Sequence, residues 1–252
     1  MSDFDRNYAA TARGYGADQA AIDAGLRAHM IRVYNYMAVA VALTGVVSWL
    51  TFQMAVGTSA TGAVALTPFG QFIFSSVGMI VLLLGTFGLV MFISFRINHL
   101  NYTTALGLFM LYAALLGVMI SSIFLTYTGQ SITRVFFISA ATFGAMSLYG
   151  YTTKRDLGPI GSFLIMGLIG LIIASLVNIF MQSSMLSFAI SAIGVLVFAG
   201  LTAWDTQKIK EMYDPADQDA VSGRKAVMGA LSLYLDFINL FLMMLRLFGD
   251  RR

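Results

Sequence analysis

Seven long apolar runs dominate the chain and exclude a soluble fold. Bilayer hydrocarbon is about 30 Å thick, so a helix that crosses it needs roughly 20 mainly apolar residues. Hydrophobic residues make up 58% of the chain and charged residues 11%, far from the average of soluble domains. The sequence therefore predicts an integral membrane protein whose solvent is the lipid bilayer. The runs lie near Ile31–Met54, Gln71–Phe95, Thr103–Tyr127, Ser131–Tyr151, Ile160–Met181, Ser184–Asp205 and Met228–Phe248.

The runs are helical rather than strand-like, because they are long and continuous, whereas strands of membrane barrels alternate over about 10 residues. We expect an all-α membrane protein, a seven-transmembrane-helix bundle over residues 31–248. Residues 1–30 form a polar N-terminal segment without the features of a cleaved leader, and residues 249–252 form a basic tail. The bundle leaves no room for a separate soluble domain.

Lysine and arginine placement predicts the orientation, because basic connections tend to stay in the cytoplasm. Basic residues gather on the side shared by the N-terminus and the connections that follow the second, fourth and sixth runs. The opposite connections, at residues 55–70, 128–130 and 182–183, contain no lysine or arginine. The N-terminus is therefore expected in the cytoplasm. Seven full crossings place the basic tail outside, and a re-entrant last run would keep it inside. The net charge of +3 comes from these flanks and requires no nucleic-acid partner.

Two aspartates, Asp205 and Asp236, are the acidic residues found inside the apolar runs. An aspartate near the bilayer centre costs roughly 2.5–3.5 kcal/mol, so such residues usually face the bundle interior and mark a proton or ion path. Asp236 follows the start of its run by eight residues, about 12 Å. If the preceding helix continues to Met212, Asp205 lies about 10 Å from the same end. Consecutive helices are antiparallel here, so the two carboxyl groups should be neighbours.

A polar seam is expected to continue from this pair. One helical face of the last run carries Ser232, Asp236, Asn239, Met243 and Arg246, at intervals of four, three, four and three residues. We predict that Ser232 and Asn239, with Thr206 from the preceding helix, line a pore beside the pair.

Two carboxylates in contact within a low dielectric cannot both ionise cheaply, so the pair should share one proton and titrate as a unit. Loss of the proton should separate the helices or draw in a cation, which makes the pair a pH switch. Ca²⁺ prefers six to eight oxygen ligands, and Asp205 and Asp236 with the three pore-lining side chains supply a partial shell. We expect weak, transient Ca²⁺ binding and no resident cofactor. The alternative is a structural aspartate pair that fixes the bundle.

Arg96, at the cytoplasmic end of the second run, could latch onto one carboxylate or could anchor the helix at the interface. His99 follows it in the next connection, where it could titrate near neutral pH or be merely solvated.

Three segments resemble the Bax-inhibitor-like transmembrane family, and most closely its bacterial inner-membrane branch. They read FGAMSLYGYTTKRDL at Phe143–Leu157, AWDTQKIK at Ala203–Lys210 and LSLYLDFINLF at Leu231–Phe241. The resemblance implies seven helices with the last one central, and a pH-sensitive Ca²⁺ leak. It implies that Asp205 and Asp236 form the di-aspartyl pH sensor and that Arg96, or His99 in an ungapped match, is the latch. Members are also associated with stress protection and with membrane-anchored proteases.

Other function classes fit less well. An intramembrane aspartyl protease would resemble YD and GxGD motifs, whereas this chain has Trp204-Asp205, Leu235-Asp236 and no GxGD. A retinal protein needs a Schiff-base lysine in the last helix, and 228–248 contains none. We expect no enzyme. The main alternative to a channel is a regulator or partner of a membrane quality-control protease, docked through the charged connection at residues 207–227.

Overall fold

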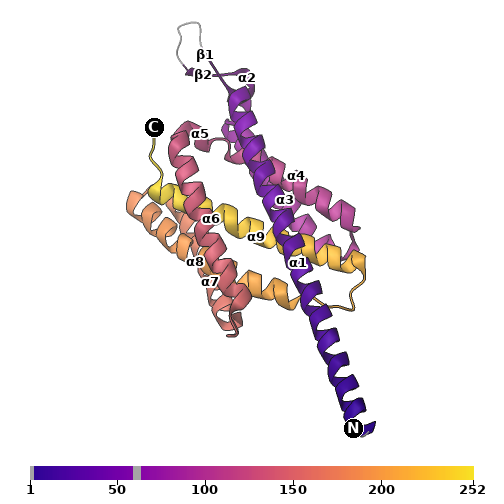
Figure 1. The fold of residues 1–252 in the computed structure, drawn as a ribbon. Helices are drawn as coiled ribbons and strands as arrows, with labels where there is room; N and C mark the ends of the chain where they lie inside the picture. The colour runs from indigo at the N-terminus through magenta and orange to yellow at the C-terminus, as the bar shows by residue number, and fades with distance from the viewer. Residues whose placement is uncertain (1–2, 59–63) are drawn as a thin grey trace.

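The computed structural model describes the backbone of residues 3–58 and 64–252, and the side chains of residues 22–57 and 65–252. The described part is helical apart from a two-stranded antiparallel hairpin, in which Val56 pairs with Leu66. Figure 1 shows the arrangement. In chain order the elements are α1 (Asp3–Ala55), β1 (Val56–Thr58), β2 (Val64–Leu66), α2 (Pro68–Ile73), α3 (Ser76–Arg96), η1 (Ile97–His99), α4 (Tyr102–Ile120), α5 (Ile123–Thr126), α6 (Gly129–Thr152), α7 (Gly158–Met181), α8 (Ser184–Glu211) and α9 (Asp219–Phe248).

Seven of the described helices are long and apolar enough to cross a bilayer, which confirms the predicted seven-helix membrane bundle. They are α1, α3, α4, α6, α7, α8 and α9, with η1 and α5 extending α3 and α4. Helix α1 continues through the predicted boundary at residue 30. The surroundings of side chains 1–21 lie outside the described residues, so the polar N-terminal segment stays a prediction.

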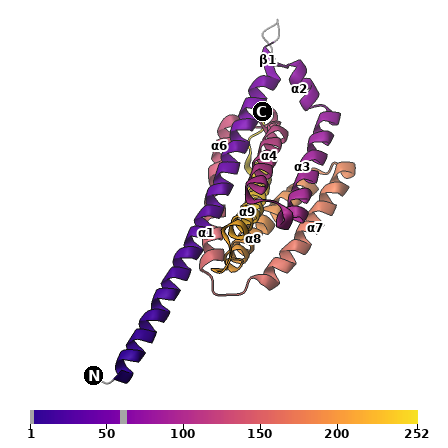
Figure 2. The ribbon, with the colours of Figure 1, turned by 90° about the vertical axis from the view of Figure 1, so that its right-hand side faces the viewer.

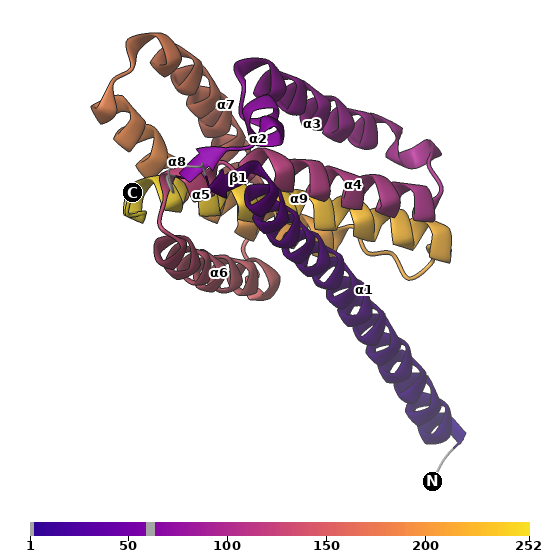
Figure 3. The ribbon, with the colours of Figure 1, turned by 90° about the horizontal axis from the view of Figure 1, so that it is seen from above.

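The last helix, α9, lies at the centre of the bundle, as the family resemblance implied. It packs against α8, α1, α6 and α4, and it is the most buried of the seven (Figures 2 and 3). Large side chains such as Tyr234 and Leu240 are completely buried on it. By contrast, α7 packs mainly against α8 and presents most of its surface outward. The bundle thus surrounds α9 with four long apolar helices.

The second long helix begins later than the apolar run suggested. The run was predicted from Gln71, but the short helix α2 ends at Ile73 and α3 starts at Ser76. Ser75 caps α3 by accepting a hydrogen bond from the Gly78 amide (3.0 Å). A side chain at Gly78 would collide with the Phe72 carbonyl oxygen, so glycine permits this tight break.

The connection between α8 and α9 is short, because both helices extend beyond their apolar runs. Helix α8 continues to Glu211, as the predicted position of Asp205 required, and α9 begins at Asp219. Within the connection, Asp217 forms a 2.6 Å ion pair with Lys225 of α9. Most of residues 207–227, predicted as a charged linker, is therefore helical.

The C-terminal tail lies at the end of the bundle opposite the N-terminus (Figure 1). Arg251 forms an antiparallel bridge with Tyr127, and Asp250 forms a 3.0 Å ion pair with Arg134. Helix α9 is continuous over 30 residues, which is long enough to span a bilayer in one pass. The side of the membrane on which the tail lies stays a prediction.

Candidate functional site

Close packing of α8 on α9 sets the position of the two aspartates. The helices are antiparallel, and two glycines bring their axes together. A Cβ atom at Gly229 would lie 3.1 Å from the Ile209 side chain, and one at Gly194 would lie 2.9 Å from Met243 Cγ. These two contacts lie on either side of the acidic pair, so they fix the register between the helices.

Asp205 of α8 and Asp236 of α9 line the same cavity and lie near enough for their carboxyl groups to interact. Asp236 is 5% exposed, and among the described residues its Oδ2 atom has no hydrogen-bond partner. Asp205 is half-buried. Two neighbouring carboxyl groups hydrogen-bond to each other only if one of them carries a proton, because an ionised carboxylate accepts hydrogen bonds but does not donate them. That Asp205 and Asp236 share one proton stays a prediction.

Both aspartates line one cavity of about 720 Å³. Its polar lining comes mainly from α8 and α9 and includes Ser232 and Asn239, and α7 adds Ser175. That this cavity is part of a pore stays a prediction. The Asn239 Nδ2 atom donates to the Leu235 carbonyl oxygen (2.8 Å). The Asn239 side-chain oxygen takes no part in this hydrogen bond. The outer wall is apolar and comes from Phe87 of α3 and a row of α7 side chains, including Ile165, Leu168 and Ile172.

Lys208 also lines the acidic cavity, and sequence reasoning did not select it. It is the basic residue whose charge acts on Asp205, three positions earlier in the same helix. The Lys208 Nζ atom lies 5.0 Å from the centroid of the Trp204 ring, which holds the ammonium group near the mouth of the cavity. The spacing of three residues on one helical face was the signal that could have identified it.

Thr206 does not line the cavity, contrary to the prediction. It is completely buried, and its Oγ1 atom donates to the Thr202 carbonyl oxygen (2.7 Å). The same atom lies 3.0 Å from Ser147 Oγ of α6. Successive residues on an α-helix point about 100° apart, so a neighbour of Asp205 in sequence faces a different helix.

The predicted latch residues do not contact the pair in this structure. Arg96 ends α3 and is exposed, and His99 is exposed in η1. Among the described residues, no ion pair joins Arg96 or His99 to Asp205 or Asp236. The latch therefore stays a prediction, which would require the end of α3 to approach α8.

The oxygen atoms that α8 and α9 supply to the site come from two carboxyl groups, one hydroxyl and one amide. Within the described residues, no group of three or more His, Cys, Asp or Glu side chains is placed to hold a metal ion. The side chains of Asp205, Asp236, Ser232 and Asn239 carry six oxygen atoms between them, the lower limit of the six to eight that Ca²⁺ prefers, so water must complete the shell wherever a carboxylate binds through one oxygen.

A bundle of seven long apolar helices around a central helix with a buried acidic pair defines a multi-pass membrane protein. The family described as "Inhibitor of apoptosis-promoting Bax1" matches residues 26–252, and the chain belongs to this family.

Relatives cover nearly the whole chain. The "Inner membrane protein YbhL" of Escherichia coli (strain K12) is 48% identical over 231 residues, which cover 91% of this chain and 94% of that protein. "Uncharacterized protein RP147" of Rickettsia prowazekii (strain Madrid E) is 49% identical over 91% of this chain and 92% of its own. A Caulobacter vibrioides (strain ATCC 19089 / CIP 103742 / CB 15) protein is 40% identical over 100% of both chains.

Proposed function

We propose that this protein is a pH-sensitive cation leak channel of the bacterial inner membrane, with Ca²⁺ as the permeant ion. The observation that carries the proposal is the position of Asp205 and Asp236 together on the wall of one cavity of about 720 Å³ in an apolar bundle. A buried acidic pair of this kind marks an ion or proton path more often than a structural contact. The printed name of YbhL, an inner membrane protein, supports the location.

Gating follows from the shared proton. With the proton in place, the pair carries one negative charge and a hydrogen bond that holds α8 against α9. Without it, two like charges face each other in a low dielectric, where their repulsion is strong. The repulsion is relieved by separation of the helices or by entry of a cation. Flux should therefore be low at acidic pH and should rise with increasing pH.

Ca²⁺ binding at the pair should be weak, because a channel must release its ion as readily as it admits it. Asp205 and Asp236 supply the charge, and Ser232 and Asn239 supply neutral oxygen atoms on the same wall. Lys208 stands at the same cavity, and its positive charge opposes cation entry. A site of this composition favours transit over storage.

The test is Ca²⁺ flux into proteoliposomes that contain only the purified full-length protein, measured over a range of pH. Wild-type flux should rise with pH, and Asp236→Asn should give flux that no longer depends on pH. Asp219→Asn is the matched control, because Asp219 lies in the first turn of the same helix and does not line the cavity. Equal pH profiles for wild type and Asp236→Asn would remove the gating assignment. Absence of flux from the wild type would favour the regulator of a membrane protease.

The latch is tested separately with Arg96→Ala. If Arg96 pairs with a carboxylate in a closed state of the channel, its removal should raise the basal leak at acidic pH. An unchanged leak would leave Arg96 as an interface anchor.

A further inference from the structure

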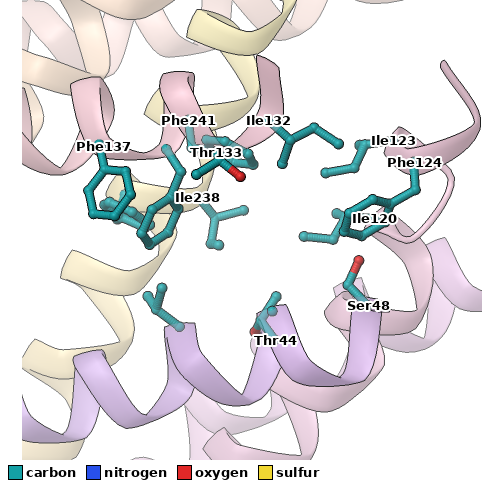
Figure 4. Close-up of a pocket in the computed structure, with 14 residues that line it drawn as sticks. Thr44, Ser48, Ile120, Ile123, Phe124, Ile132, Thr133, Phe137, Ile238 and Phe241 are labelled. Atoms are coloured by element: carbon teal, nitrogen blue, oxygen red, sulfur yellow. The ribbon is translucent and has the colours of Figure 1, made fainter. Parts of the chain in front are cut away.

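A second cavity, of about 320 Å³, lies on the opposite face of α9 from the acidic pair. Phe237, Ile238 and Phe241 line it, whereas Asp236 and Asn239 line the acidic cavity. At 3.6 residues per turn these two sets point in opposite directions. The remaining wall comes from α1, the end of α4, α5 and the start of α6 (Figure 4). Its volume falls within the range of about 300–1,000 Å³ that small-molecule sites occupy.

One polar group in this cavity has no partner. The Thr44 hydroxyl donates to the Ala113 carbonyl oxygen (2.8 Å), and the Thr133 hydroxyl donates to the Gly129 carbonyl oxygen (3.0 Å). The Ser48 hydroxyl is different: the residue is 2% exposed, and no partner exists for its Oγ atom in the described part of the chain. Figure 4 shows this oxygen pointing into the cavity. A buried hydroxyl without a hydrogen bond is costly, so a ligand with an acceptor would satisfy it.

The cavity opens toward lipid between α1 and α6. Helix α1 packs mainly against α4 and α9, and α6 packs mainly against α8 and α9, so the two helices leave a gap on the outside of the bundle. Phe137, at the rim of the cavity, is 67% exposed. Because this rim faces the bilayer, the molecule that enters must come from the bilayer.

The depth of Ser48 matches the position of a lipid ester group. Ser48 shares the cavity with Thr133, which lies four residues, or about 6 Å, from the start of α6. Helix α6 has 24 residues and is about 36 Å long, so it extends about 3 Å beyond each side of the roughly 30 Å hydrocarbon layer. Ser48 itself lies seven residues, or about 10 Å, before the end of α1 at Ala55. Both residues are therefore near the end of the bundle opposite the N-terminus, the side on which the acyl chains of that leaflet join the glycerol of a phospholipid.

We infer that this cavity binds one acyl chain of a phospholipid from the leaflet opposite the N-terminal end, and that Ser48 donates a hydrogen bond to the ester carbonyl oxygen. The isoleucine and phenylalanine side chains contact the methylene groups. With the N-terminus in the cytoplasm, as its basic flanks predict, this is the outer leaflet.

A substitution at a glycine can fill the cavity without disturbing the packing around it. A Cβ atom added at Gly45, which lines the cavity, would meet no atom within 4 Å. Gly45→Leu therefore fills the cavity without a collision at its first side-chain atom. The matched control is Gly85→Leu on α3, where an added Cβ is equally free and the site is exposed away from the cavity.

The experiment uses a phosphatidylethanolamine with a photoactivatable diazirine on its acyl chain. The full-length protein is reconstituted with this lipid and irradiated, and adducts are mapped by mass spectrometry. Phe180 of α7, which is 87% exposed, reports ordinary contact with bulk lipid. We expect adducts at Phe124, Ile132 and Phe137 to exceed those at Phe180.

The variants separate a bound chain from passing lipid. Gly45→Leu should lower the cavity adducts by about tenfold, because the leucine occupies the space of the chain. Ser48→Ala should lower them by about two- to tenfold through loss of one hydrogen bond. Gly85→Leu should change nothing, constant Phe180 adducts show that the lipid probe is equally available to each variant, and thermal unfolding in detergent shows that each variant is folded. Cavity adducts no stronger than those at Phe180, or unaffected by Gly45→Leu, overturn the inference. A photoactivatable free fatty acid that labels the cavity as strongly as the phospholipid overturns the assignment of the ester.

Discussion

The two faces of α9 differ in how their buried side chains affect stability: one carries packed aromatic rings, and the other carries a buried carboxyl group. On one face, Phe237 is 3% exposed and packs edge-on against the rings of Phe136 and Phe143, each 5.6 Å away between centroids. On the other face, Asp236 is buried almost as fully but leaves a carboxylate oxygen without a partner in the described chain. The first arrangement stabilises the bundle, and the second costs stability. A buried carboxyl group that costs stability is expected at a functional site, so this difference supports the proposed gating role of Asp236.

The largest expected effect is on the packed face. Phe237→Ala removes a buried ring from the centre of the bundle and should lower the free energy of unfolding by about 3 kcal/mol. This is the low end of the range for core phenylalanines, because a membrane-embedded unfolded state also surrounds the ring with apolar groups. Thermal and denaturant unfolding in detergent measures the loss. Phe180→Ala, at an outward-facing site, should change stability by less than about 0.5 kcal/mol. Equal losses for the two variants would contradict the central role of α9.

The acidic face should respond in the opposite direction. Asp236→Leu removes a buried carboxyl group and should leave the free energy of unfolding unchanged or raise it by up to about 2 kcal/mol. The same unfolding measurement applies. A loss of more than about 1 kcal/mol would instead mean that the aspartate pair is structural, because the pair would then contribute more than a typical hydrogen bond.

The hydrogen bond between Tyr234 and Thr44 gives a third, smaller test of how much the buried groups of α9 contribute to stability. Tyr234 is completely buried, and its hydroxyl donates to Thr44 Oγ1 (2.7 Å), which itself donates to Ala113. Tyr234→Phe keeps the ring and should cost about 1 kcal/mol of unfolding free energy. The coupling is checked by a double-mutant cycle with Thr44→Val, in which the two losses should not add. Additive losses would show that this hydrogen bond contributes nothing.

The smallest expected effect concerns Lys208. Its positive charge favours ionisation of the nearby pair, so Lys208→Gln should move the midpoint of the flux–pH curve to higher pH by less than about one unit, since the exposed ammonium is screened. Lys210→Gln is the control, because the Lys210 Nζ atom donates to the Tyr151 carbonyl oxygen (3.0 Å) and does not line the cavity. A shift to lower pH, or equal shifts for both lysines, would contradict the assignment of Lys208.

Hydropathy predicted the seven spans, and helical spacing predicted that Asp205 and Asp236 lie at a similar depth on neighbouring helices. Both aspartates line one cavity with Ser232 and Asn239, and a pore at this place stays a prediction. Thr206 follows Asp205 in the sequence and was therefore predicted beside it, but successive residues of a helix point in different directions, and Thr206 faces α6. Lys208 was missed although its spacing from Asp205 was visible in the sequence.

Three features could not be predicted from the sequence, because they depend on how the backbone segments are arranged in space, which the spacing of apolar residues does not specify. The lipid-facing cavity beside Ser48 exists because α1 and α6 diverge. The late start of α3 depends on one close backbone approach at Gly78. The hairpin of β1 and β2 pairs segments of three residues each, too short to give a strand pattern.

The most direct measurement is infrared spectroscopy of the carboxyl groups in full-length protein labelled with ¹³C-aspartate and held in a lipid bilayer. If Asp205 and Asp236 share one proton, a single protonated-carboxyl band should disappear in one step over the pH range in which Ca²⁺ flux rises. Asp205→Asn and Asp236→Asn should each move that step. A band that is absent throughout, or a step that neither substitution moves, would contradict the shared proton.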